Sequence, residues 1–317
     1  KTYGTIALES GKNETKINNA TEANLTNGIR KVIQDKKKII YFLEGHGEKS
    51  THKIDKNAYT IAKSELEKDG HEVKKLLLLQ TGSIPENTDL LVINGPIKPL
   101  LKNELEIIDS YLGKGGAVFL LVDPQSKPGI DNFLIKWGIE LGDDLIIDPL
   151  SKLFGGDTAA PVIGSFAEHG ITKDFGLNVI LPLPRSVKAS PHDNLKTVEL
   201  MKTQPNSWAE KNYKNPKITS DPKIDSPGPI SVAVVSSLDL KDAKNIETSN
   251  EDDTEIKQAG ETNRQARLVV IGDSDFASNT YFNFSGNGDF FLNAVSWLVQ
   301  EENLISIRPK QRRNAPL

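Results

Sequence analysis

The 317-residue sequence contains no cysteine. This absence excludes disulfide bonds, thiolate nucleophiles and cysteine-based metal sites. No apolar run approaches the roughly 20 residues that a membrane-spanning helix needs. Methionine occurs once, at Met201, and the chain starts at Lys1. We therefore expect a fragment or a processed product, so that any flanking segment, including any membrane anchor, lies outside the sequence.

An excess of charge of one sign is also lacking. The chain has 39 Lys and Arg residues against 43 Asp and Glu residues, which gives a net charge of −4. Such a balance provides no electrostatic reason to bind a polyanion. The short basic clusters at 36–38 and 312–313 have no interleaved aromatic residues and are typical of solvated surface. We expect no nucleic-acid partner.

From residue 38 onward the apolar pattern alternates between strand and helix. Continuous apolar runs predict strands over 38–43, 73–79, 89–93 and 117–122, and helical spacing predicts helices over 57–69, 101–112 and about 130–137. Strands of this kind that alternate with helices are typical of a parallel sheet with helices on both faces. The sequence therefore predicts an α/β fold with a doubly wound, mostly parallel sheet of the broad flavodoxin-like class.

Composition divides the chain into four parts. Residues 1–36 predict an N-terminal hairpin and helix, and 37–141 form the first part of the α/β core. Residues 142–229 are rich in Pro and Gly and predict an irregular insertion. Residues 230–310 complete the core with strands at 230–235 and 267–271 and a helix at 290–299. The charged, aromatic-free segment 241–265 within this part predicts a mobile acidic loop.

In open parallel sheets, ligands bind beyond the carboxyl ends of the strands. The residues that follow the predicted strands are therefore the candidate ligand-binding residues. They are Glu44, His46, Glu48, Asn94, Asp123, Asp273, Ser274 and Asp275. Imidazole and carboxylate side chains of this kind can ligate a metal or transfer protons. A purely structural role accounts for the same residues, since His46 fits a tight turn and the acidic side chains can cap the 273–275 loop. We predict no catalytic residue, no metal ligand and no cofactor.

Familiar catalytic motifs are incomplete in this chain. It contains neither a phosphate-binding Gly-x-x-x-x-Gly-Lys-Ser/Thr loop nor a Gly-x-Gly-x-x-Gly sequence after a strand. The sequence Gly272-Asp273-Ser274-Asp275-Phe276 half-resembles a nucleophile elbow, but Phe276 replaces the second glycine. It also half-resembles a calcium loop, but Phe284 stands where the bidentate Glu would be. Neither motif assigns an activity.

Several stretches resemble the GldG-like proteins. Residues 37–48, with the sequence Lys-Lys-Ile-Ile-Tyr-Phe-Leu-Glu-Gly-His-Gly-Glu, are similar to the family's opening strand and turn, and 88–99, 115–124 and 270–297 resemble later stretches in the same order. These proteins are auxiliary components of ABC-type transport systems, including those of gliding motility. The resemblance implies a fold similar to class I glutamine amidotransferases. Their cysteine nucleophile is missing here, and Asp123-Pro124 stands at the comparable strand end.

The resemblance also implies a setting. It places the domain on the extracytoplasmic (periplasmic) face of the bacterial inner membrane, anchored by flanking helices that this chain does not include. Its expected partners are the permease and ATPase subunits of the transporter. The leading hypothesis is a non-enzymatic subunit that binds a small molecule, a glycan or a partner protein and couples it to the membrane complex. The alternatives are a metal-dependent or acid/base hydrolase that uses the strand-end acidic residues and, because Trp208 lies in a loop, a carbohydrate-binding module.

Overall fold

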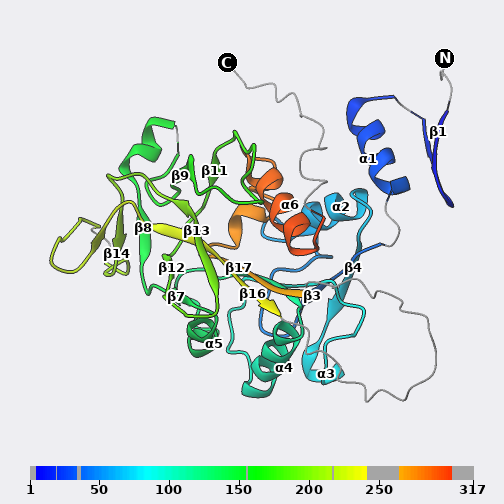
Figure 1. Cartoon of the computed structure of the whole chain (residues 1–317). Coiled ribbons are helices and arrows are strands. Elements are labelled where there is room, and N and C mark those ends of the chain that lie inside the picture. The colour runs from blue at the N-terminus through cyan, green and yellow to red at the C-terminus, as the bar shows by residue number, and fades with distance from the viewer. Residues whose placement is uncertain are drawn as a thin grey trace.

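A computed structural model describes residues 5–18, 20–33, 37–154, 156–215, 218–240 and 264–301. Its centre is a large sheet (Figure 1), whose eight strands have the order β10-β13-β16-β17-β6-β5-β3-β4. These strands are β3 (Ile39–Leu43), β4 (Glu72–Leu76), β5 (Leu90–Asn94), β6 (Ala117–Leu121), β10 (Ser165–Phe166), β13 (Lys196–Lys202), β16 (Ser231–Leu240) and β17 (Arg264–Ile271). The predicted α/β class is confirmed.

The prediction that the sheet is mostly parallel is confirmed only in part, because the sheet is mixed. Strands β4, β3, β5, β6 and β17 are parallel to one another. Strands β16, β13 and β10 are added antiparallel. The consecutive strands β16 and β17 pair from Ala233↔Ile271 to Leu240↔Arg264. Strand β16 is buried over its first seven residues, and a continuous apolar run of this kind looks the same in either strand direction.

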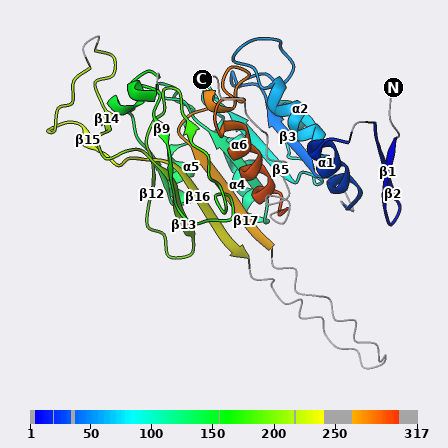
Figure 2. The same cartoon turned by 90° about the horizontal axis from the view of Figure 1, so that it is seen from above.

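Helices cover both faces of the sheet (Figures 1 and 2). Helices α2 (Thr60–Lys68) and α6 (Asn287–Leu298) lie on one face, and α3 (Leu78–Thr81), α4 (Lys102–Gly113) and α5 (Asp131–Lys136) lie on the other. None of the helices in the described ranges is both long enough and apolar enough to span a bilayer. The sheet is thus buried between two helical layers, which explains the continuous apolar sequences of its strands.

The N-terminal part forms a small unit of its own. Strands β1 (Ile6–Ser10) and β2 (Asn13–Ile17) form an antiparallel hairpin, and α1 (Glu22–Ile33) packs against it. The predicted hairpin and helix are therefore confirmed. In Figure 1 this unit lies on the same side of the molecule as β4, the edge strand of the sheet.

The insertion contributes to the main sheet through β10 and β13 and also forms smaller sheets. Its further elements begin just before residue 142. They are β7 (Ile139–Leu141), β8 (Leu145–Ile147), the 3-10 helix η1 (Pro149–Phe154), β9 (Val162–Ile163), β11 (Val179–Ile180), β12 (Val187–Ala189), β14 (Trp208–Glu210) and β15 (Ser226–Pro227). Strand β7 pairs with β12, β9 with β11, and β14 with both β8 and β15.

Two further predictions need correction. The predicted strand 73–79 ends at Leu76, and Leu78–Thr81 is the short helix α3. A run of leucines does not distinguish strand from helix, and Gly82, with φ of 66°, ends this helix in the left-handed conformation that glycine tolerates. The predicted mobile loop 241–265 overlaps β17, which begins at Arg264, and its remainder, 241–263, lies outside the described residues.

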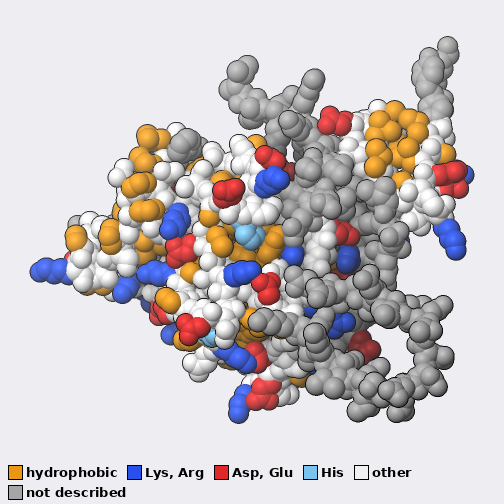
Figure 3. Space-filling model, viewed as in Figure 1, with side chains coloured by type: hydrophobic (Ala, Val, Ile, Leu, Met, Phe, Trp, Pro, Cys, Tyr) orange, Lys and Arg blue, Asp and Glu red, His pale blue; other side chains and the backbone are white. Residues whose placement is uncertain are grey.

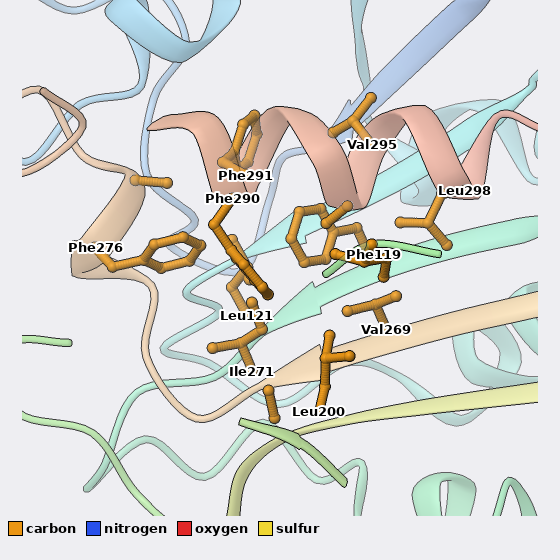
Figure 4. Close-up of a cluster of buried hydrophobic side chains, with 14 of the residues drawn as sticks. Phe119, Leu121, Leu200, Val269, Ile271, Phe276, Phe290, Phe291, Val295 and Leu298 are labelled. Atoms are coloured by element: carbon orange, nitrogen blue, oxygen red, sulfur yellow. The ribbon is translucent and has the colours of Figure 1, made fainter. Parts of the chain in front are cut away.

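An aromatic cluster fixes the loop that follows β17. Phe276, in the 3-10 helix η2 (Asp275–Ala277), is fully buried and points toward α6, where Phe290 and Phe291 lie over β6 and β17 (Figure 4). The ring centroids of Phe119 and Phe291 are 5.5 Å apart, and Phe276 contacts both α6 phenylalanines edge-on or tilted. Such pairs add about 0.5–1.5 kcal/mol each to the stabilisation by burial. The acidic residues before Phe276 are therefore held on a rigid support.

Candidate functional site

The parallel strands bring their carboxyl ends to one rim of the sheet. Asn94, the last residue of β5, is paired with Leu121 at the end of β6, and Leu121 is paired with Ile271 at the end of β17. Asp123 and Asp273 each follow two residues after these strand ends. Neighbouring parallel strands thus place these polar side chains along one edge, where ligands bind in open α/β sheets.

Three carboxyl groups meet at this rim. One oxygen from each of Asp123, Asp273 and Asp275 lies within 4.8 Å of the other two. The main-chain N–H of Ser274 donates to Asp123 Oδ1 (2.5 Å), and the Ser274 hydroxyl donates to Asp123 Oδ2 (2.6 Å). The N–H of Asp275 donates to Asp273 Oδ1 (2.7 Å). We call these three carboxyl groups the acidic cluster.

A lysine that the sequence analysis passed over neutralises part of the acidic cluster. The Nζ atom of Lys49 forms an ion pair with Asp275 Oδ1 and lies 3.7 Å from Asp123 Oδ2. The Lys49 main chain is fixed by Asn94, because the Lys49 N–H donates to Asn94 O (3.0 Å) and Asn94 Nδ2 donates to Lys49 O (2.8 Å). Lys49 directly follows Glu48, so the same positional rule would have found it.

Burial and charge shift the ionisation of the cluster. Burial acts to lower the pKa of Lys49, but the carboxylates of Asp123 and Asp275 outweigh it, and the pKa is raised. Burial, reinforced by Asp123 and Asp275, raises the pKa of Asp273 well above its usual value. Both pKa shifts are expected when several carboxyl groups lie close together in a site shielded from water.

Two neighbouring residues, Tyr59 and Gly95, constrain the position of Ser274 beside the acidic cluster. The hydroxyl of Tyr59, a fully buried residue, donates to the carbonyl oxygen of Ser274. Burial raises the pKa of Tyr59 well above its usual value, so this hydroxyl stays a donor. Gly95 has φ of 72°, and a Cβ atom there would lie 2.5 Å from Ser274 Oγ. Both the conformation and the close approach require glycine.

His46 and Glu48 belong to a second, separate set of side chains. His46 Nε2 lies 2.9 Å from Glu104 Oε2, and His46 Nδ1 lies 3.3 Å from Glu48 Oε1. Glu104, in the first turn of α4, also accepts the N–H of Leu101 (2.9 Å) and so caps that helix. These interactions join the turn after β3 to α4. The sequence analysis missed Glu104, since helical spacing alone gives no reason to place it near His46.

The structure thus separates the eight candidate residues. Asp123, Asp273, Ser274 and Asp275 come together, and Asn94 reaches them through Lys49. His46 and Glu48 contact Glu104 instead. Glu44 forms an ion pair with Lys75 of β4 (3.2 Å).

The space beside the acidic cluster is small. A cavity of about 100 Å³ is lined by Asp123 and Asp275 together with Pro124, Gln125, Leu145 and Leu183. Pockets for drug-sized ligands have volumes of about 300–1,000 Å³. The cavity therefore suits water molecules or an ion rather than a larger organic ligand. Elsewhere, on the face seen in Figure 3, Lys and Arg side chains are interspersed with Asp and Glu.

Comparison with known proteins identifies the family. A family profile described as "ABC-type uncharacterized transport system" matches residues 37–294. The chain belongs to this family. The match spans the whole sheet and both sets of rim side chains, and the family name indicates an auxiliary component of an ABC transport system. No curated protein sequence matches the chain significantly.

Comparison with solved structures gives two similar chains. The structure titled mmIFT52 N-terminal domain has a TM-score of 0.56 and 13% sequence identity, and the match covers 82% of this chain and 97% of that one. A putative ThuA-like protein from Bacteroides uniformis has a TM-score of 0.46 and 13% identity, with 83% and 91% coverage. At such identities the first likeness shows a shared fold alone. The class I amidotransferase-like and flavodoxin-like assignments stay predictions.

Proposed function

We propose that this chain is the extracytoplasmic domain of a GldG-like, non-enzymatic auxiliary subunit of an ABC transporter. It binds a partner protein or a ligand and couples it to the permease and ATPase subunits in the membrane. Membership of the transport family over residues 37–294 supports the association with a transporter. The resemblance of 37–48 and 270–297 to GldG-like sequences supports the narrower assignment.

The state of Ser274 favours a binding role over a hydrolytic one. Its hydroxyl contacts the acidic cluster, yet Ser274 is fully buried and its hydroxyl proton is donated to Asp123 Oδ2. A nucleophile must reach its substrate and be activated by a base that a third group orients. Here the hydroxyl forms a structural hydrogen bond that holds the loop after β17. The rim consequently acts as a rigid scaffold.

Copurification tests the proposed coupling directly. Full-length protein, with its natural flanking sequence and an affinity tag, should retain the permease and the ATPase encoded with it after detergent extraction. Recovery of the tagged protein without either subunit, while the permease and ATPase still copurify with each other, would refute the coupling. Protease treatment of spheroplasts tests the location, because an extracytoplasmic domain is digested while the inner membrane is intact.

An activity screen tests the non-enzymatic assignment. The wild-type chain and Asp123→Asn should show the same background rate on panels of ester, amide and glycoside substrates. A rate that exceeds background and falls in Asp123→Asn, but not in the matched surface variant Asp157→Asn, would establish the hydrolase alternative instead. Loss of surface spreading on deletion of the gene in a gliding host would support the gliding-motility branch of the family.

A further inference from the structure

The acidic cluster carries more negative charge than its neighbours neutralise. Three carboxyl groups meet there, and Lys49 contacts two of them. Arg185 lies close by, but its guanidinium donates to main-chain carbonyl oxygens of Gly142 and Asp123 rather than to the carboxylates. Among the described residues, Lys49 is therefore the cation that forms ion pairs with the cluster.

One oxygen of the cluster lacks a hydrogen-bond donor. Asp273 is fully buried, and its Oδ1 accepts the Asp275 N–H. Its Oδ2 is buried too and has no donor within the part of the chain that the structure describes. Leaving a buried acceptor unpaired costs about 1–3 kcal/mol, and more for a charged group. A cation at this position would satisfy the oxygen and balance the charge together.

We propose that Asp123, Asp273 and Asp275 bind a hard divalent cation of the Ca²⁺ or Mg²⁺ class. Such ions prefer carboxylate oxygen ligands. Ca²⁺–oxygen distances of about 2.3–2.6 Å place two oxygens on opposite sides of the ion about 4.6–5.2 Å apart, and Mg²⁺, at about 2.0–2.1 Å, requires about 4.2 Å or less. Ligand oxygens that lie within 4.8 Å of one another are close enough to share one ion of this class.

Lys49 competes with the ion in this arrangement. Its ammonium contacts two of the proposed ligand residues, so it must withdraw when a divalent ion binds. The side chain is long and flexible, and 14% of it is exposed, which leaves it a route toward solvent. The cavity beside Asp123 and Asp275 offers space for the water molecules that complete the coordination shell.

Isothermal titration calorimetry with CaCl₂ or MgCl₂, each alone, tests the site on the EDTA-treated chain. The wild type should bind a single ion. Asp273→Asn should weaken binding by at least about tenfold, which is the lower bound when even an outer-shell residue is removed. Glu106→Gln removes the same charge from an exposed position of α4 (66% exposed) and should leave the affinity unchanged. Lys49→Met should increase the affinity, because the competing ammonium is gone.

Three results would overturn the proposal. The first is wild-type protein that binds neither ion. The second is an equal effect of Asp273→Asn and Glu106→Gln, which would indicate diffuse surface binding. The third is binding by Lys49→Met alone, which would make Lys49 the permanent counter-ion of the cluster.

Terbium luminescence provides a readout if Asp273→Asn does not fold. Tb³⁺ replaces Ca²⁺ at oxygen sites, and the Tyr59 ring, whose hydroxyl contacts Ser274, should sensitise its emission. Ca²⁺ should quench this emission, and Tyr59→Phe should reduce it. Emission that Ca²⁺ does not displace would contradict the site. Ion binding is independent of the transporter assignment, so a failed copurification leaves this test intact.

Discussion

Removal of the Lys49 ammonium should destabilise the fold by about 2 kcal/mol in the presence of EDTA. The change Lys49→Met keeps the aliphatic stem and removes the charge. Breaking a fully buried ion pair costs about 3–5 kcal/mol, and breaking an exposed one costs about 0–1 kcal/mol. Side-chain exposures of 14% for Lys49, 27% for Asp123 and 28% for Asp275 place this network between the two limits.

A double-mutant cycle isolates the ion pair from other effects of the substitution. Urea unfolding of the wild type, Lys49→Met, Asp275→Asn and the double variant should give a coupling energy of about 1–2 kcal/mol, since these side chains are in direct contact. Lys68→Met serves as the control, because the exposed pair Lys68–Glu65 on α2 should couple by no more than about 0.5 kcal/mol. A coupling between Lys49 and Asp275 no larger than that of the control would refute the reasoning.

The pH dependence of the same variant follows from the pKa of Lys49. Because this pKa is raised in the folded state, the stabilisation is complete below the ordinary value of about 10.5 and is lost as the pH rises through the folded value. Lys49→Met should lack this alkaline loss. The wild-type and variant unfolding free energies should accordingly converge above about pH 10.5. Curves that stay parallel across this range would contradict the assignment.

Three further predictions concern the support of the cluster. Because burial raises the pKa of Asp273 in the folded state, the contribution of Asp273 to stability falls as the pH rises above about 3.8. In EDTA, Asp273→Asn should therefore reduce the pH dependence of the free energy of unfolding in urea between about pH 4 and 8. An unchanged slope would contradict this. Phe291→Ala should lower the free energy of unfolding by about 3–5 kcal/mol, whereas Phe284→Ala, at a site that is 52% exposed, should change it by less than about 1 kcal/mol; similar losses would argue against the core packing. Gly95→Ala should destabilise the protein more than Gly82→Ala, because both glycines have positive φ but an added Cβ atom meets Ser274 Oγ only at Gly95. Thermal unfolding compares the two variants. Equal shifts in Tm would show that the close approach does not matter.

The sequence predicted the strands of the parallel half and their shared rim, because burial between two helical layers gives each strand a continuous apolar pattern that ends in a polar turn. Strand β6, for example, lies within its predicted range 117–122. The direction of β16 was missed, since an apolar run carries no information on direction. Glu104 was missed for another reason, as its contact with His46 depends on how α4 packs, and no local pattern reports that.

The two sets of rim side chains meet in one dipeptide, Glu48-Lys49. Glu48 contacts His46 and accepts its N–H (2.7 Å), and Lys49, the next residue, contacts the acidic cluster. Asn94 holds the Lys49 main chain from both its N–H and its C=O. Withdrawal of the Lys49 ammonium therefore requires rotation of the side chain alone, and the main chain stays fixed. The acidic cluster can exchange one cation for another while the contact between His46 and Glu104 keeps α4 in place.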